Sequence, residues 1–403
     1  MIGIFGTSDV ENYGDLLYPR IFEHLLSRSG VSSSVRAFGF MATTAPAGAG
    51  YTTHAISALL HAARRTVDAL CIGGGDILRT DYRTMASHYV RHHGTAPNRR
   101  SRWWPWKKPP TDDQLADEFL SRHTNFASVG PLVLDASVHA MASPMAYWSC
   151  GVPFDIDPAA RIALSAAMDS AAYVYVRDSQ SAAKLLRAGV KKPLHVAPDA
   201  IVTLSDRHAM PSVKAAGKRI LANHGIDVTR RVLRFQAVSL DPAAITEVAA
   251  QLACYGHNTG EEVALIPIGH CHGDHHTLAE LAKVCPGTVK LIPVRQIDDI
   301  LAAIVACDAF VGTSLHGNIT SFSYGIPHLA GPLAVDKLQG FIDVVGLDAE
   351  VLLTDWSQLH ERLRWLRAQP LSRLSRRVER AKAEVYRTFA EMLTHLGLPG
   401  RAA

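Results

Sequence analysis

One stretch near residue 310 constrains the fold more than any other part of the chain. It reads AFVGTSLHGNITSFSYGIPHLA, from Ala309 to Ala330. An apolar run from Ile304 to Val311 stops at Gly312, and a polar elbow follows before Asn318 opens a pattern with helical spacing. A strand, a glycine-containing elbow and a helix N-terminus form a place where α/β proteins hold anions, because free N–H groups and the helix dipole point there. The stretch therefore predicts a ligand-binding elbow around His316, at the carboxyl end of a parallel strand.

Short apolar runs alternate with helical patterns through the rest of the chain, and this alternation resets near residue 206. Such alternation predicts two α/β domains, each a Rossmann-like, doubly wound parallel sheet, facing each other across a cleft. The expected boundaries are 1–206 for the N-terminal domain, 207–229 for a linker, 230–350 for the C-terminal domain and 351–403 for C-terminal helices. The strands are expected at 2–5, 69–72, 125–129, 173–176, 195–197, 233–239, 263–268, 289–292 and 309–311.

Composition narrows the functional classes. The chain has 403 residues, 48% of them hydrophobic, and a formal net charge of +4, which is too small to indicate nucleic acid binding. Six cysteines lie scattered without a CxxC pair, as expected of a reduced cytoplasmic protein. The N-terminus reads as a first strand, and no apolar stretch reaches the roughly 18–20 residues of a membrane span.

Four further features occur in order along the chain. They are the loop Asn12-Tyr13-Gly14-Asp15, the triplet Gly73-Gly74-Gly75, the segment from Val176 to Ser181 followed by Ala197-Pro198-Asp199, and the elbow Thr313-Ser314-Leu315-His316-Gly317 followed by Gly325-Ile326-Pro327 and Lys337. In this order and spacing they resemble the polysaccharide pyruvyl transferase family. The resemblance runs from near residue 1 to about residue 345.

The resemblance implies a GT-B-like enzyme that moves pyruvate from phosphoenolpyruvate onto two hydroxyls of a sugar and so forms a cyclic ketal. The acceptor would belong to a cell-surface polysaccharide or its lipid-linked precursor. Phosphoenolpyruvate would be the donor substrate, and neither a cofactor nor a metal would be required. The expected location is the cytoplasm, with peripheral contact to the inner face of the cell membrane.

Three residues are the catalytic candidates. His316 suits an acid–base or phosphate-stabilising role because a free imidazole titrates near neutral pH. Arg177 would bind a carboxylate or phosphate, and Asp15 would act on the acceptor sugar or a water molecule. Each has a structural alternative. His316 would be a structural histidine at a helix start, Arg177 an ion-pair partner of a neighbouring aspartate, and Asp15 a helix cap.

A larger set would bind the substrates. Its members are Asn12, Gly74, Gly75, Asp76, Arg79, Asp199, His270, His272, Arg295, Thr313, Ser314, Gly317, Asn318 and Lys337. The family commonly has arginine at the position of Ser314, so one positive charge is missing from the elbow. Arg295 or Lys337 would replace it. The glycine triplet lacks the Lys-Ser/Thr ending of a P-loop, so nucleotide hydrolysis is not expected.

Two segments have unusual compositions. The cluster from His270 to His276 matches no strong zinc template, and three interpretations stay open: a solvated loop, a polar loop that faces the ligand, and a metal site. Residues 99–110 read RRSRWWPWKKPP, with Trp103, Trp104 and Trp106 among five basic residues and three prolines. This loop has the composition of a membrane-interface anchor or a sugar-stacking surface.

Two other functions stay open at this stage. The first is a glycosyltransferase of the same architecture, with the diphosphate of a nucleotide-sugar at the helix N-terminus near His316. The second is a glycan-binding or assembly protein without catalytic activity. Binding of nucleoside diphosphates would favour the first, and full function after His316→Ala would favour the second.

Overall fold

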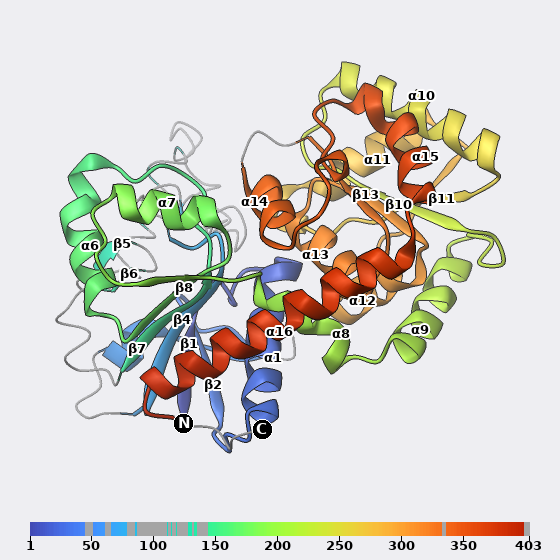
Figure 1. The fold of residues 1–403 in the computed structure, drawn as a ribbon. Helices are drawn as coiled ribbons and strands as arrows, with labels where there is room; N and C mark the ends of the chain where they lie inside the picture. The colour runs from blue at the N-terminus through green and yellow to red at the C-terminus, as the bar shows by residue number, and fades with distance from the viewer. Residues whose placement is uncertain are drawn as a thin grey trace, which may run out of the picture.

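A computed structural model gives the fold. It describes residues 1–44, 51–60, 66–78, 85–86, 111, 114, 118, 128–130, 133–134, 144–332 and 336–398. Two α/β domains lie side by side, and the long helix α16 (Leu371–His395) runs across both (Figure 1). The two α/β domains with parallel sheets that the alternating pattern predicted are confirmed.

The N-terminal domain is built on a parallel sheet with the strand order β3-β2-β1-β4-β7-β8-β9. Its central strands are buried on both faces, which is why they read as continuous apolar runs in the sequence. The strands are β1 (Ile2–Phe5), β2 (Val35–Gly39), β3 (Thr53–Ala55), β4 (Ala69–Gly75), β7 (Met145–Cys150), β8 (Tyr173–Val176) and β9 (Leu194–Val196).

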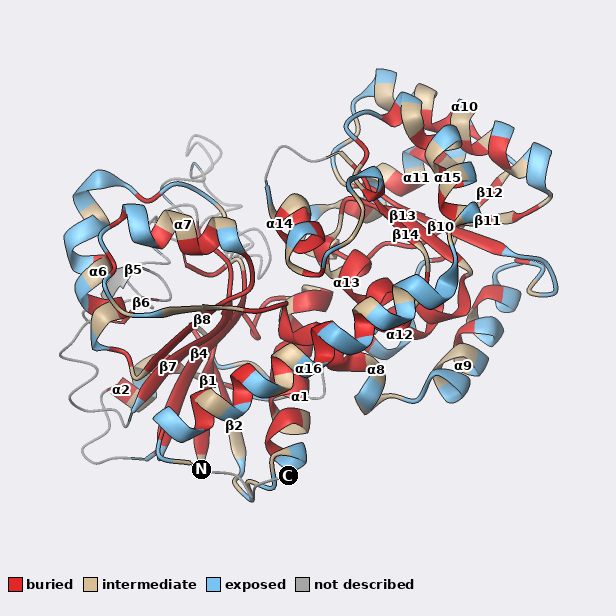
Figure 2. Cartoon of the chain, in the orientation of Figure 1, coloured by how far each residue is buried: buried red, intermediate tan, exposed pale blue. Residues whose placement is uncertain are grey.

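Helices cover both faces of this sheet. Helix α1 (Tyr13–Arg28) and α16 pack on one face, whereas α6 (Arg161–Ser170) and α7 (Ser179–Arg187) pack on the other (Figure 2). Asp178 begins α7 by accepting a hydrogen bond from the Ser181 amide at 2.6 Å. The short helix α2 (Ile56–Leu60) follows β3, and β5 (Ser128–Gly130) and β6 (Val133–Leu134) form a separate antiparallel pair.

The C-terminal domain is a second parallel sheet, with the order β12-β11-β10-β13-β14. Helices α12 and α13 cover one face, and α10, α11 and α15 cover the other. The strands are β10 (Val232–Gln236), β11 (Glu262–Leu265), β12 (Val289–Leu291), β13 (Ala309–Gly312) and β14 (His328–Ala330). The helices are α10 (Pro242–Thr259), α11 (Asp274–Val284), α12 (Ile297–Ala306), α13 (Leu315–Ser323), α14 (Lys337–Val344) and α15 (Leu359–Ala368).

One apolar core continues from the first domain into the second. It joins α1 and α16 to α12 and α13. The segment expected as a linker contains α8 (Leu204–Arg207) and α9 (Met210–Asn223). Helix α9 packs tightly on α12, because Gly217 lies so close to the Ala302 carbonyl that a Cβ there would approach its oxygen to 1.9 Å. No helix in the described ranges is long and apolar enough to cross a bilayer.

Two expectations about the first domain were wrong. The segment 125–129 was predicted as a strand of the main sheet, but residues 128–130 form β5 in the separate pair, and 125–127 lie outside the described residues. The place between β4 and β8 is taken by β7, whose sequence MAYWSC follows Pro144. Its serine and aromatic residues hide it from a search for aliphatic runs, although every residue in it is buried.

Helix α13 also begins earlier than expected. The sequence placed the helix start at Asn318, but Ser314 is the N-cap and its hydroxyl accepts a hydrogen bond from the Gly317 amide at 3.2 Å. A serine cap starts a helix at once, so His316 lies inside the first turn of α13 rather than in a preceding elbow.

The buried histidine of β14 makes stability depend on pH. Burial lowers the pKa of His328 to about 4, although Nδ1 donates a hydrogen bond to the Ile326 carbonyl at 3.0 Å. Between about pH 6.5 and pH 4 the unfolded chain binds a proton that the folded chain rejects, so stability falls as the pH falls. We expect wild type to lose roughly 2 kcal/mol more than His328→Asn between pH 7 and pH 5.

Urea unfolding at both pH values measures this difference. The control is His257→Asn, at an exposed position in α10, which should follow wild type. Equal pH dependence in wild type and His328→Asn would show that the imidazole does not stay neutral in the fold.

Candidate active site

A cavity of about 410 Å³ lies where the carboxyl ends of the two sheets face each other. In each sheet the chain reverses its direction of winding between two adjacent strands, β1 and β4 in the first and β10 and β13 in the second. Ligands of open α/β sheets bind at such switch points. The loops after these strands and after β11 supply most of the wall: Thr7, Asn12, Asp15, Asp76, Ile77, Met85, Gln236, Val238, Ser239, Gly269, Cys271, His272, Asp274, Thr313, Ser314, Leu315, His316 and Lys337.

His316 enters the cavity from the first turn of α13 and meets the first turn of α1. The contact is very close, because a Cβ on Gly14 would lie 1.7 Å from His316 Nδ1. The rings of His316 and Tyr18 also meet edge to face, with centroids 5.8 Å apart. Only glycine at position 14 permits this approach, and the helix start of one domain thereby fixes the histidine of the other.

A hydrogen-bonded chain continues behind the imidazole. His316 Nε2 lies 3.2 Å from the Tyr18 hydroxyl, which donates to Asp199 Oδ2 at 2.6 Å. The same carboxylate oxygen lies 3.8 Å from Nε2. Burial would raise the pKa of Asp199, but the hydrogen bond and charge of His316, the charge of Arg177 and the Tyr18 hydroxyl together lower it. Asp199 is therefore held as a carboxylate beside the imidazole.

Arg177 lies behind the cavity, with only 3% of its side chain exposed, and contacts three carboxylates. Its guanidinium bonds to Asp76, lies 3.4 Å from Asp199 Oδ2 and lies 3.9 Å from Asp178 Oδ2. The ion pairs weighed as an alternative role for Arg177 are therefore present. Lys337, on the rim, lies 3.7 Å from the other oxygen of Asp76.

Asp15 is a half-buried acid beside His316. Burial raises its pKa, and the charge of His316 and hydrogen bonds from Asn12 and Thr7 only partly oppose this. The Asn12 amide donates to Asp15 Oδ2 at 2.9 Å. Asn12, not Asp15, is the N-cap residue of α1, so the capping role weighed for Asp15 does not apply.

The glycine triplet serves helix packing at this site. Gly74 and Gly75 have φ angles of +91° and +86°, which disfavour residues with side chains. A Cβ on Gly74 would lie 2.1 Å from Tyr18 Cγ, and one on Gly75 would lie 2.9 Å from Asp15 Oδ1. The triplet thus brings the end of β4 against the two α1 side chains that face His316.

The wall from the C-terminal domain contains Gln236, which the sequence analysis did not single out, and Asp274, which belongs to the cluster from His270 to His276. Gln236 accepts from the Ser314 amide at 2.9 Å and donates to Asp274 Oδ2 at 3.1 Å. The same oxygen accepts from the amides of Ile268 and Gly269 at 2.7 and 2.8 Å. Both residues occupy unusual places for their type, a glutamine ending an apolar strand and an aspartate opening a helix, and these signals could have identified them.

Other predicted residues differ in how they relate to the cavity. Thr313 lines it but accepts a hydrogen bond from the Val238 amide at 3.2 Å, which joins two loops. Asn318 is buried and donates to the Gly312 carbonyl at 2.9 Å. His270 stacks on His275, with ring centroids 4.9 Å apart, while the neighbouring His272 reaches the cavity.

Arg295 is engaged elsewhere. It forms a two-pronged ion pair with Glu11, with Nη2 lying 2.7 Å from Oε2, and 62% of its side chain is exposed. This pair joins the two domains outside the cavity wall. Arg79 and the three tryptophans Trp103, Trp104 and Trp106 lie outside the described residues.

Comparison with known families identifies the family of this chain. The profile of the polysaccharide pyruvyl transferase family matches residues 12–330, a range that contains Asn12, Gly74, Arg177 and His316. The chain belongs to the polysaccharide pyruvyl transferase family. Membership makes it a transferase of the kind that modifies polysaccharides. Among curated proteins, none has a sequence that matches this chain.

Solved structures share the fold of this family member at low sequence identity. UDP-GlcNAc 2-epimerase from Neisseria meningitidis aligns over 98% of this chain and 99% of its own, with 10% identity and a TM-score of 0.52. Anabaena HepE aligns over 98% and 99%, with 12% identity and a TM-score of 0.50. Trehalose 6-phosphate synthase from Burkholderia multivorans aligns over 98% of this chain and 98% of its own, with 12% identity and a TM-score of 0.50.

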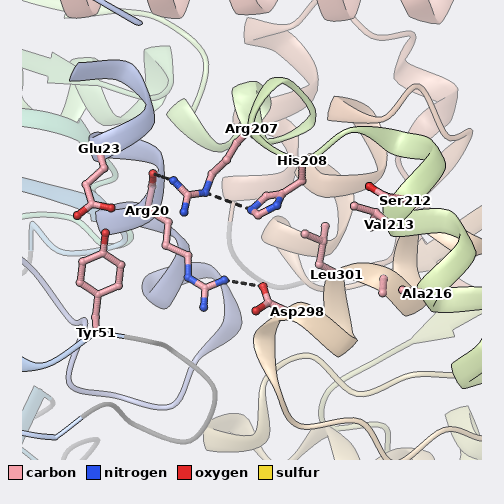
Figure 3. Close-up of a pocket in the computed structure, with 11 residues that line it drawn as sticks. Arg20, Glu23, Tyr51, Arg207, His208, Ser212, Val213, Ala216, Asp298 and Leu301 are labelled. Carbon is pink, nitrogen blue, oxygen red and sulfur yellow. Dashed lines mark hydrogen bonds and ion pairs between the residues drawn. The ribbon is translucent and has the colours of Figure 1, made fainter. Parts of the chain in front are cut away.

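A larger cavity, of about 720 Å³, lies between α1, α9 and α12. It holds none of the predicted site residues, and Figure 3 shows its polar groups turned toward one another. Arg20 pairs with Asp298 at 2.6 Å, and Arg207 donates to the Arg20 carbonyl at 2.9 Å. These contacts connect the domains and the segment that joins them, so we assign the catalytic role in this transferase to the smaller cavity.

The contact between Gly14 and His316 gives a direct test of the site. A methyl group in Gly14→Ala must displace the imidazole, and misplacing a catalytic group by about 1 Å costs on the order of 100-fold in rate. We expect Gly14→Ala to lose about that much kcat while the protein stays folded. Gly256→Ala in α10 is the control, because its Cβ meets nothing closer than 3.6 Å and should leave kcat unchanged.

Proposed function

We propose that this protein is a ketal pyruvyl transferase that moves pyruvate from phosphoenolpyruvate onto two hydroxyls of a sugar in a cell-surface polysaccharide or its lipid-linked precursor. Family membership supports a transferase acting on polysaccharide. The observation that carries the proposal is the His316–Tyr18–Asp199 chain at the cavity where both switch points meet.

The reaction needs two proton movements. One sugar hydroxyl attacks C2 of phosphoenolpyruvate and gives up its proton, while C3 gains a proton and becomes a methyl group. The second hydroxyl then attacks C2 and displaces inorganic phosphate, which leaves with the remaining proton. The site must therefore supply an acid for C3, a base for the hydroxyl and donors for the leaving phosphate.

We assign the acid to His316 and the base to Asp15. Asp199 and Tyr18 hold the imidazole by Nε2, which fixes its orientation in the cavity. Asp15 lies within the electrostatic influence of His316 and lines the same cavity, and a raised pKa makes a carboxylate a stronger base. The N-terminus of α13 faces the cavity and favours the phosphate.

Arg177 has a positioning role in this scheme. It is saturated by three carboxylates, so we assign it to holding Asp76 and Asp199 rather than to gripping the donor. Lys337 is partly exposed on the cavity rim and is the described side chain that we assign to the donor carboxylate.

A thermal-shift titration tests the donor. Phosphoenolpyruvate at 100 times its dissociation constant should add about 2.7 kcal/mol to the free energy of unfolding, whereas UDP and GDP should add nothing. His316→Asn should keep this binding and lose turnover, and Lys337→Met should weaken the binding. Stabilisation by UDP or GDP alone would instead establish the nucleotide-sugar glycosyltransferase.

The pH dependence of kcat tests the base. Because Asp15 must be ionised, kcat should fall at acidic pH with a midpoint above the ordinary aspartate value of 3.8. The hydrogen bond from Asn12 lowers the pKa of Asp15, so Asn12→Ala should move this midpoint to higher pH. Asp15→Asn should remove the acidic limb together with most of the activity. An unmoved midpoint in Asn12→Ala would assign the limb to another group.

A further inference from the structure

Arg234 is a buried cation that no step above has used. It lies in the middle of β10, the central strand of the C-terminal sheet, and 0% of it is exposed. Its hydrogen bond to the Ile266 carbonyl is long, at 3.4 Å, and Nε and Nη1 have no partner among the described residues. No carboxylate in the described ranges lies within ion-pair distance of it.

Such a group is costly for the fold. Removing a charge from water without a partner opposes folding more than almost any other burial. Burial lowers the pKa of Arg234 to about 10, yet at neutral pH the guanidinium remains charged. The nearest compensation is the ring of Phe310, whose centroid lies 4.5 Å from the guanidinium carbon. Proteins accept local costs of this size chiefly where function requires them.

The charge lies directly under the wall of the cavity. Side chains two residues apart on a strand share a face, so Arg234 lies below Gln236, which bonds to the Ser314 amide. The ring of Phe310 separates Arg234 from the first turn of α13, because a Cβ on Gly317 would lie 2.8 Å from Phe310 Cζ. The cation is thus one aromatic ring away from the turn that carries His316.

Other cations near the cavity face carboxylates. Arg177 contacts three of them, and Lys337 faces Asp76. The field of Arg234 is opposed less, because Asp274 lies beyond ion-pair distance. Asp274 Oδ2 instead accepts hydrogen bonds from the Gln236 side chain and from the amides of Ile268 and Gly269. In a buried region of low dielectric this field reaches the cavity and adds to the positive end of the α13 dipole.

We propose that Arg234 holds an anionic ligand in the cavity through its field, without touching it, and so supplies the positive charge that Ser314 does not. The inference rests on the proposed function only in that the donor is an anion. Arg234 is therefore a positioning residue for the donor. Unit charges on the order of 10 Å apart, at an effective dielectric of about 20, change a dissociation constant on the order of tenfold.

The test compares stability with affinity in Arg234→Met, which keeps the length of the side chain and removes its charge. We expect the melting temperature to rise, because the unpaired buried charge is gone, and the dissociation constants of phosphoenolpyruvate and inorganic phosphate to rise on the order of tenfold. The loss should be larger for phosphoenolpyruvate, which carries more charge. Arg234→Lys should bind within a few-fold of wild type.

Arg367→Met is the matched control. Arg367 is also partly buried in the C-terminal domain, but it pairs with Glu261 and bonds to the Asp308 carbonyl at 2.9 Å. Its loss should lower the melting temperature and leave ligand affinity unchanged. Unchanged affinity in Arg234→Met, or an equal loss in Arg234→Lys, would overturn the inference.

The proposed function and this inference can fail separately. If wild type binds UDP but not phosphoenolpyruvate, the donor assignment is wrong, and the inference then predicts that Arg234→Met weakens UDP binding. If wild type binds phosphoenolpyruvate and Arg234→Met binds it equally well, the donor assignment stands and the role of Arg234 does not.

Discussion

The site depends on the contact between the first turns of α1 and α13. These helices belong to different domains, and Gly14 allows them to approach until one backbone touches the imidazole of the other. Tyr18 lies one turn further along α1. Its hydroxyl contacts His316 Nε2 and donates a hydrogen bond to Asp199. The histidine is therefore part of the domain interface as well as part of the cavity wall. Its orientation depends on the position of one domain relative to the other.

The two walls of the cavity differ in their electrostatics. The N-terminal wall gathers several aspartates around Arg177, so its charges balance locally. The C-terminal wall carries Asp274 and Lys337 among neutral polar groups, and beneath it lies Arg234, which has no ionic partner in the described part of the chain. The hydroxyls of an acceptor sugar and an anionic donor would thus meet different surroundings on the two sides of one cavity.

The sequence predicted the sheet class, the two-domain plan and most strand positions, because parallel strands read as short apolar runs that end at glycine or a polar loop. It did not predict β7, where aromatic and polar residues are buried in a strand. It identified His316, Asp15 and Arg177, but it could not show that Arg177 is saturated by carboxylates that lie up to 101 positions away. Arg234 and Tyr18 were missed because their importance arises from tertiary contacts and not from local spacing.

Helix α16 has a consequence for how the chain is made. It supplies Phe389, which packs on Phe22 and Trp148 of the N-terminal domain with ring centroids 5.4 and 6.0 Å away, and Glu391, which accepts from Tyr173 at 3.0 Å. These partners are synthesised more than 200 residues before Phe389 and Glu391. Domains usually fold as they emerge from the ribosome. Here the N-terminal domain keeps an open apolar face until α16 has followed, so its completion comes after synthesis of the C-terminal domain.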